Sequence, residues 1–263
     1  MKIKHILGLA LALPLSLSSL SHADLKENDL ATSIQQDYDN RLGALYTHFH
    51  RNPELSFIEF KTAKKLANEL RSSGFEVTEK VGGTGVVAIL KNGDGPLVMM
   101  RGDMDALPVE EKSGLEYASK ATQSDPITGK EVPVMHACGH DGHTTMLLAA
   151  AQHLAQHRHF DGTVYLIFQP AEEDGAGGQV MVQESIMDRF EIDQVYGIHN
   201  APNLLSERWM KLKTFCQKVF VKGTVIQRCS KPWFNCISLQ ILIMPRKHAN
   251  DLHLMRLFCC KHF

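Results

Sequence analysis

After its first 20 residues the sequence lacks any apolar stretch of about 18 residues, the length that a membrane-spanning helix requires. The apolar run at the start, Ile6 to Leu20, is interrupted by Pro14 and is short for a membrane span. The glycine-rich loops Gly82–Gly85 and Asn92–Gly95 lack the G-x-x-x-x-G-K-[ST] spacing of a phosphate-binding loop. These absences argue against a membrane-embedded protein and against a phosphate site at either loop.

A low content of charged residues, 22%, together with 44% hydrophobic residues, excludes a disordered chain. At 263 residues the chain can bury a full core, in one large domain or two small ones. Acidic residues almost disappear after Ser206, where eleven Lys and Arg accompany only Glu207 and Asp251. This part has a net charge of +9. Because the whole chain has a net charge of −1, the rest of it carries −10. The same part holds most of the cysteines and both tryptophans: Cys216, Cys229, Cys236, Cys259, Cys260, Trp209 and Trp233. The two parts do not have the composition of one domain.

The first residues have the features of an export signal. Lys2 and Lys4 precede the apolar run, and Ser21-His22-Ala23 places small residues at positions −3 and −1 before Asp24. We therefore predict a signal peptide at residues 1–23, a periplasmic or secreted protein and no stable membrane anchor.

The densest group of potential metal ligands is MHACGHDGH, Met135 to His143. It contains one thiol, three imidazoles and one carboxylate: Cys138, His136, His140, His143 and Asp141. Thiolate and neutral imidazole suit Zn²⁺ or a related ion, and two glycines allow the backbone to turn. The alternative is a surface loop that is rich in histidine. The setting favours a metal site, because carboxylates and another histidine follow strands on both sides.

Hydrophobic periodicity predicts an α/β sheet with helices around it. We expect helices at residues 29–50, 59–73, 143–157 and 179–186, and strands at 75–81, 86–90, 97–101, 163–168 and 193–198. In the first helix one apolar stripe is expected to be core: Ile34, Tyr38, Leu42, Leu45, Tyr46 and Phe49. We interpret His48 and His50 as surface or satisfied histidines. The long polar segment from Val109 to Val134 is predicted to be a loop that forms a wall of the site.

Carboxylates and a histidine follow three of the predicted strands. Asp103 and Asp105 follow one strand, Glu172 and Glu173 the next, and His199 the last. Open α/β sheets bind ligands at the carboxyl ends of their strands. A hydrolytic metal site needs one carboxylate to hold the ion and another to take a proton from water. Solvated loop charges or a helix cap are the alternatives.

The segments RGDMDALP, MHACGHDGHT, FQPAEE and GIHN resemble the M20 metallopeptidase family. They are similar to its amidohydrolase branch, which includes hippurate hydrolase, N-acyl-amino-acid amidohydrolases and the auxin-conjugate hydrolases. The resemblance extends from about Asp37 to Asn203. It implies an α/β, mixed-sheet, three-layer, zinc-peptidase-like catalytic domain with a smaller dimerisation domain inserted. The implied substrate is a small N-acyl amino acid or short peptide.

The resemblance also implies roles for single residues. Cys138 is similar to a thiolate ligand that can bridge two ions, and the further implied ligands are His140, Glu173 and His199. Glu172 matches the general base and Asp105 a carboxylate that orients a ligand. The expected supporting residues are Asp103, His136, Asp141 and His143. One or two divalent ions are implied, with Zn²⁺, Mn²⁺, Co²⁺ and Ni²⁺ all acceptable to these ligands. The expected reaction is hydrolysis of an amide to a carboxylic acid and a free amino acid.

After Asn203 the sequence departs from the family pattern. We predict a partial catalytic domain at residues 24–204 and an unrelated, basic, cysteine-rich tail at 205–263, explained by a reading-frame shift near Leu204 or alternatively by a lineage-specific module. The family's dimerisation domain, its dimer interface and one further metal-binding histidine are then missing. Three functions stay open: an amidohydrolase, an inactive metal-binding remnant, or a basic interaction module. Export argues against nucleic acid as a partner.

Overall fold

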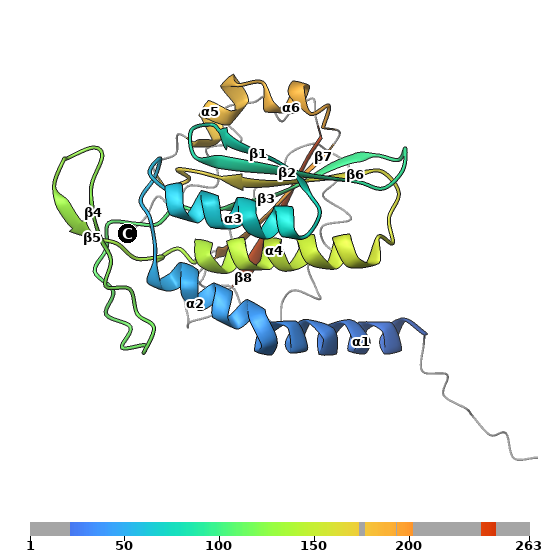
Figure 1. Ribbon diagram of the computed structural model, residues 1–263, viewed down its shortest axis with the longest axis horizontal. Helices are drawn as coiled ribbons and strands as arrows, with labels where there is room; N and C mark the ends of the chain where they lie inside the picture. The colour runs from blue at the N-terminus through green and yellow to red at the C-terminus, as the bar shows by residue number, and fades with distance from the viewer. Residues whose placement is uncertain (1–21, 174–176, 193, 202–237, 246–263) are drawn as a thin grey trace, which may run out of the picture. The chain divides into compact units, whose positions relative to one another are not determined.

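The protein is represented by a computed structural model that describes residues 22–173, 177–192, 194–201 and 238–245 (Figure 1). Two compact units are present, residues 1–41 and residues 42–263. In the first unit α1 (His22–Asp37) leads into η1, a π-helix (Tyr38–Leu42) whose last residue belongs to the second unit. Ala23 and Asp24, on either side of the expected cleavage site, belong to α1, and the apolar run before them lies outside the described residues.

The expected apolar stripe of the first helix is only partly core. Leu42, Leu45 and Phe49 are buried, whereas Ile34 and Tyr38 are 53% and 47% exposed. The buried residues belong to the end of η1 and to α2 (Gly43–Arg51). The periodicity predicted the face of the helix correctly, but period alone does not say how far along that face another element covers it.

Six strands form one mixed sheet in the order β1-β2-β6-β3-β7-β8. Their bounds are β1 Glu76–Val81, β2 Gly85–Lys91, β3 Leu97–Asp103, β6 Thr163–Gln169, β7 Gln194–Ala201 and β8 Ser238–Pro245. The central trio β6, β3 and β7 is parallel, while β1, β2 and β8 pair antiparallel with their neighbours. β8 lies within the tail that we expected to be unrelated, and its backbone pairs with β7 along Gln194–Ala201.

Helices cover both faces of this sheet and make three layers (Figure 1). One face packs on α2, α3 (Phe60–Ser72) and α4 (His140–His157), with Leu66, Leu148 and Leu166 in its core. The other packs on α5 (Gly177–Gln183) and α6 (Ile186–Arg189), with Met181 and Ile167 in its core. Adjacent residues of β6 thus enter opposite cores, as a strand with two covered faces requires. The predicted mixed-sheet, three-layer α/β fold is confirmed.

The long segment between β3 and α4 is not wholly a loop. It contains a short antiparallel hairpin, β4 (Thr122–Ser124) and β5 (Glu131–Pro133). The carboxylate of Asp125 accepts hydrogen bonds from the Ile127 amide and the Thr128 hydroxyl, which form the turn between the two strands. Such side-chain turns are easily overlooked in a polar sequence.

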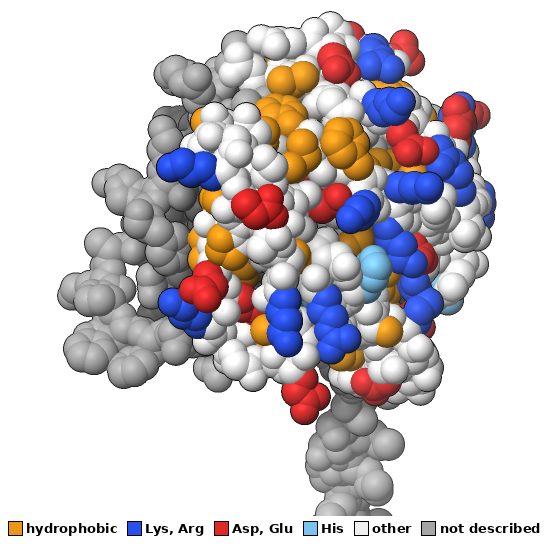
Figure 2. All heavy atoms as spheres, turned by 60° about the vertical axis from the view of Figure 1, so that its left-hand side comes forward, with side chains coloured by type: hydrophobic (Ala, Val, Ile, Leu, Met, Phe, Trp, Pro, Cys, Tyr) orange, Lys and Arg blue, Asp and Glu red, His pale blue; other side chains and the backbone are white. Residues whose placement is uncertain are grey.

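Acidic and basic side chains lie side by side over the face shown in Figure 2, with hydrophobic side chains between them. Such a mixture of both signs is typical of a solvated surface. Among the described residues, no helix combines the length and the apolar character that crossing a membrane demands.

Candidate metal centre

The carboxyl ends of β3, β6 and β7 meet at one edge of the sheet, because these strands are parallel. Asp103 ends β3, Glu172 and Glu173 follow β6, and His199 lies in β7. α4 begins at His140, after Gly139 turns the chain with a φ of 81°, and the His140 ring contacts Asp105 near the end of β3. The predicted convergence of the strand ends with the MHACGHDGH segment is therefore found in the structure.

One set of potential ligands consists of Cys138, His140 and Glu173, whose ligand atoms all lie within 4.8 Å of one another. His199 extends it, since its Nε2 atom lies 4.0 Å from the Cys138 Sγ atom. These are the four residues that the sequence predicted as ligands. Cys138, His140 and His199 are buried and Glu173 is half-buried.

Hydrogen bonds fix the orientation of both candidate histidine ligands. His140 donates from Nδ1 to the Asp105 carbonyl oxygen at 2.8 Å, and His199 donates from Nδ1 to the Asn200 carbonyl oxygen at 2.6 Å. A carbonyl oxygen only accepts, so each Nδ1 atom carries a proton and each Nε2 atom is the one that can bind an ion. Metal-binding histidines are usually held in this way.

The environment of His140 Nε2 fits a divalent cation. This buried atom has no hydrogen-bond partner among the described residues. Carboxylate oxygens of Asp103, Glu172 and Glu173 surround it at 3.7, 3.6 and 3.7 Å. These distances are too long for hydrogen bonds. They are close to the separation of about 3.4 Å expected between two ligand atoms that share a tetrahedral zinc ion at about 2.1 Å.

The electrostatics of the centre also favour a positive charge. Burial lowers the pKa of His140, but the negative charges of Asp103 and Asp105 outweigh it and raise the pKa to about 10. Burial likewise raises the pKa of Glu172 to about 8, assisted by the charge of Asp103. Buried carboxylates raise the pKa of His140, whereas the pKa of Glu172 is raised first by burial and then by the charge of Asp103. A bound cation would offset the buried negative charge.

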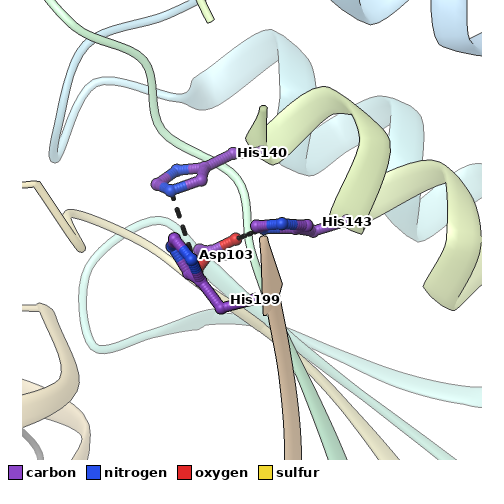
Figure 3. Close-up of side chains that lie close together, drawn as sticks. All are labelled: Asp103, His140, His143 and His199. Atoms are coloured by element: carbon purple, nitrogen blue, oxygen red, sulfur yellow. Dashed lines mark hydrogen bonds and ion pairs between the residues drawn. The ribbon is translucent and has the colours of Figure 1, made fainter. Parts of the chain in front are cut away.

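A second set of potential ligands is Asp103, His140, His143 and His199 (Figure 3). In this set both ring nitrogens of His143 are already used: Nδ1 donates to Asp103 at 2.5 Å, and Nε2 accepts from the Asn200 amide at 3.0 Å. His143 therefore supports Asp103 and leaves no lone pair for an ion.

Asp103 is itself neutralised by a residue that the sequence analysis did not select. The buried Arg101 guanidinium binds the Asp103 carboxylate at 2.5 Å and donates to Gln169 at 3.0 Å. Burial would raise the pKa of Asp103, yet the charges of Arg101 and His140 hold it well below its usual range. The sequence did contain a sign of this pair, because an arginine at the end of a buried strand needs an acidic partner close to it.

Asp105, predicted to be an orienting carboxylate, lies behind the centre. Its Oδ2 atom accepts from the Ser56 hydroxyl at 2.7 Å and from the Glu173 amide at 3.0 Å. Burial would raise its pKa, but the hydrogen bond and charge of His140 outweigh burial and lower it. Asp105 thus joins His140 to the backbone of Glu173.

The structure brings His136 and Asp141 close to the centre without bonding them to a predicted ligand. His136 is buried, neither ring nitrogen has a hydrogen-bond partner among the described residues, and burial lowers its pKa to about 4. Asp141 binds Nδ1 of His50 at 2.6 Å, and Nε2 of His50 binds Glu111 at 3.0 Å. His50 is a satisfied histidine, as expected, but its role in holding Asp141 was missed.

The residues of the candidate centre lie in a part of the chain that is similar to known proteins. A sequence profile described as Peptidase family M20/M25/M40 matches residues 99–235. The match passes residue 204, where we expected the resemblance to end, and continues into residues outside the described part, so the predicted domain boundary stays a prediction. The site residues lie within the matched range.

Among similar proteins is hippurate hydrolase of Campylobacter jejuni, 47% identical over 154 residues, which are 58% of this chain and 37% of that protein. IAA-amino acid hydrolase ILR1-like 5 of Arabidopsis thaliana is 38% identical over 77% of this chain and 43% of its own length. The chain thus spans less than half the length of these relatives. Among solved structures, the YXEP protein of Bacillus subtilis, described as a dinuclear metal-binding peptidase of the M20 family, is 36% identical with a TM-score of 0.57, over 65% of this chain and 46% of that one.

Proposed function

Because the chain belongs to peptidase family M20, we propose that it is a metal-dependent amidohydrolase that cleaves the amide bond of N-acyl amino acids. The observation that carries the proposal is the convergence of Cys138, His140 and Glu173 on one point, with the Glu172 carboxylate beside it. This arrangement supplies ligands and a base in one buried place, as metal-assisted hydrolysis requires.

The proposed ligands are Cys138, His140, Glu173 and His199, and they suit one or two ions of Zn²⁺, Mn²⁺, Co²⁺ or Ni²⁺. When bound, a divalent ion supplies Lewis-acid chemistry, which polarises a carbonyl group and lowers the pKa of water towards about 7. The protein itself orients the two histidine rings through hydrogen bonds from their Nδ1 atoms. Its Arg101 side chain neutralises the charge of Asp103.

Glu172 is the proposed general base. Its side chain is buried, and its two oxygens have no hydrogen-bond partner among the described residues, so both are available to a substrate water. Burial raises the pKa of Glu172, which makes its carboxylate a stronger proton acceptor than that of a solvated glutamate. In the proposed reaction Glu172 accepts a proton from water and passes it to the leaving amine.

The proposed substrates are small N-acyl amino acids or short peptides. The relatives support this class, since their names refer to hippurate, to IAA-amino acids and, for a protein of Bacillus subtilis that is 40% identical over 168 residues, to N-acetyl-L-cysteine. N-Benzoylglycine is therefore the first substrate to test.

A second candidate function is that of a protein that binds a metal ion but hydrolyses no substrate. It is favoured by the ligand cluster taken alone, because the ligand atoms of Cys138, His140 and Glu173 lie within 4.8 Å of one another whether or not a substrate is hydrolysed. In this case the four ligands would bind an ion without hydrolysing any substrate.

We also propose export, with the signal peptide at residues 1–23. The support is the charged, apolar and small-residue pattern before Asp24. Sequencing the amino terminus of protein recovered from the periplasm tests this proposal, and a mature chain that begins at Asp24 is expected. Recovery only from the cytoplasm with Met1 retained would contradict it.

The activity test uses the full chain, supplied in turn with each of the four metals, and a panel of N-acyl amino acids. We expect release of the free amino acid, and we expect Glu172→Gln to lower kcat by about 100-fold or more, because the proton acceptor is lost. Glu131→Gln is the matched control, since Glu131 is an exposed glutamate of β5. Metal binding without turnover would favour the second candidate, and equal rates for wild type and Glu172→Gln would exclude Glu172 as the base.

A further inference from the structure

Glu59 is a buried carboxylate that the proposed mechanism does not use. It is 0% exposed and immediately precedes α3. Its Oε1 atom accepts a hydrogen bond from the Ala171 amide at 2.8 Å, and its Oε2 atom accepts one from the Thr84 hydroxyl. Glu59 therefore connects the β1–β2 turn to the residue that precedes Glu172, which lies more than a hundred positions away in the sequence.

Helix capping does not account for Glu59. It occupies the N-cap position of α3, but its side chain makes no cap hydrogen bond. The amides of Lys61 and Thr62 are instead bound by the carboxylate of Glu54, at 3.2 and 2.7 Å. Burial raises the pKa of Glu59 to about 7, which shows that burying this carboxylate is unfavourable to its charged form. The helix does not require that burial.

The residue that Glu59 holds has a strained backbone. Ala171 is 0% exposed and has a φ of 48°, in the left-handed region. For a residue with a Cβ atom this conformation is unfavourable and persists only where the surroundings impose it. On the other side of the peptide, the Ala171 carbonyl oxygen accepts from the Gly177 amide at 3.1 Å.

Two residues of the centre, Glu172 and Glu173, directly follow this strained turn. Glu172 lies between two restrained amides, that of Ala171, bound by Glu59, and that of Glu173, bound by Asp105 at 3.0 Å. If Ala171 relaxed to a negative φ, the Cα–Cβ bonds of Glu172 and Glu173 would change direction. The candidate base and a candidate ligand would then both leave the centre.

We propose that Glu59 is a positioning residue that holds Ala171 in the left-handed conformation and thereby directs Glu172 and Glu173 into the metal centre. The part that concerns Glu172 rests on the proposed function. The part that concerns Glu173 does not, because it predicts metal affinity whether or not the chain turns over.

The test compares substitutions in the full chain. Glu59→Met keeps much of the side-chain volume and removes the acceptor, whereas Glu59→Gln keeps an acceptor for Ala171 and a donor for Thr84. Glu54→Gln is the matched control, since Glu54 is also buried and serves the same helix, but its carboxylate does not bind Ala171. Ala171→Gly in the Glu59→Met background tests the strain, because glycine adopts a positive φ without cost.

Three readouts are independent of one another: Zn²⁺ affinity by calorimetry, amide hydrogen exchange at Ala171, and kcat and KM on N-benzoylglycine. We expect Glu59→Met to weaken Zn²⁺ binding about tenfold, in the range seen when a residue that orients a ligand is lost. Exchange at Ala171 should become faster, and kcat should fall at least tenfold with KM changed less than threefold. In Glu59→Gln all three quantities should stay within threefold of wild type. Ala171→Gly in the Glu59→Met background should recover part of the Zn²⁺ affinity.

Glu54→Gln is expected to lower the unfolding temperature while leaving Zn²⁺ affinity unchanged. Equal Zn²⁺ affinity and equal Ala171 exchange in folded Glu59→Met and wild type would overturn the proposal, as would an equal loss of affinity in Glu54→Gln. If wild type hydrolyses nothing, the proposed function fails, and the first two readouts still decide the role of Glu59. If Glu59→Met does not fold, rapid exchange at Ala171 in wild type would overturn the proposal and slow exchange would support it.

Discussion

At the scale of single residues, the second ring nitrogen decides which histidines are available to an ion. His140 and His199 each donate from Nδ1 to a backbone carbonyl and keep Nε2 for the centre. His143 uses both nitrogens, one for Asp103 and one for the Asn200 amide. His143, for which the sequence predicted a supporting role, therefore differs chemically from His140 and His199.

Replacing the thiol gives a test of the ligand set that needs no activity. In the full chain loaded with Co²⁺, we expect Cys138→Ser to remove the near-ultraviolet thiolate-to-cobalt absorption and to weaken Co²⁺ binding at least tenfold, since a hydroxyl does not ionise as a thiol does. Absorption titration measures both effects. Ser113→Ala, at an exposed serine of the loop after β3, is the control. Unchanged Co²⁺ absorption in Cys138→Ser would exclude Cys138 as a ligand.

At the scale of elements, His50 connects three segments. It lies at the end of α2, binds Asp141 in the first turn of α4 and binds Glu111 in the loop after β3. Glu111 in turn accepts hydrogen bonds from Ser113 and from the Ser119 amide. The loop that follows the Asp103-Met104-Asp105 segment is thus held to the end of α2 and the start of α4 by side-chain hydrogen bonds.

This connection predicts a pH dependence of stability. The hydrogen bond to Asp141 raises the pKa of His50 to about 9, although burial opposes it, from an ordinary value of 6.5. Because the folded pKa is raised, the stabilisation is fully present below about pH 6.5 and is lost as the pH rises through 9. Between pH 6.5 and 9.5 we expect the free energy of unfolding of wild type to fall by on the order of 1 kcal/mol more than that of His50→Gln.

Urea unfolding of metal-free protein across this pH range measures the effect. His48→Gln is a close control, because His48 lies on the same helix and is exposed. A wild-type curve and a His50→Gln curve that run parallel between pH 6.5 and 9.5 would refute the prediction.

At the scale of the whole molecule, the metal centre lies where several parts of the fold meet. Its residues come from β3, the segment before α4, α4 itself, the turn after β6, and β7. Unfolding would separate all of them, so the centre exists only in the folded chain. Binding of an ion is therefore coupled to folding.

Addition of Zn²⁺ should accordingly stabilise the chain. At a free concentration 100 times the dissociation constant, the free energy of unfolding is expected to rise by about 2.7 kcal/mol, and removal of the ion by a chelator should reverse the gain. Denaturant unfolding with and without Zn²⁺ measures this change, and His140→Ala should abolish it. A gain of equal size in His140→Ala would place the ion elsewhere.

Much of this organisation was predictable from local sequence. The strands with two buried faces, the amphipathic helices and the clustering of ligands at strand ends all depend on periodicity and spacing, which each segment carries in its own residues. Cys138, His140, Glu173 and His199 were selected in this way and by resemblance, and the structure brings them together. The signal peptide and the tail after residue 204 stay predictions from the sequence.

Other features depend on contacts between residues that are far apart in the chain. Arg101 binding Asp103, His50 binding Asp141 and Glu59 binding Ala171 leave no periodic signal, because each depends on a buried polar group finding a partner supplied by another element. The exposure of Ile34 has another reason, since periodicity does not say how far along a helix another element covers its apolar face. The sequence by itself determined which chemical groups reach this edge of the sheet. The tertiary structure decided which of their lone pairs stay available to an ion, because hydrogen bonds between elements occupy the other lone pairs.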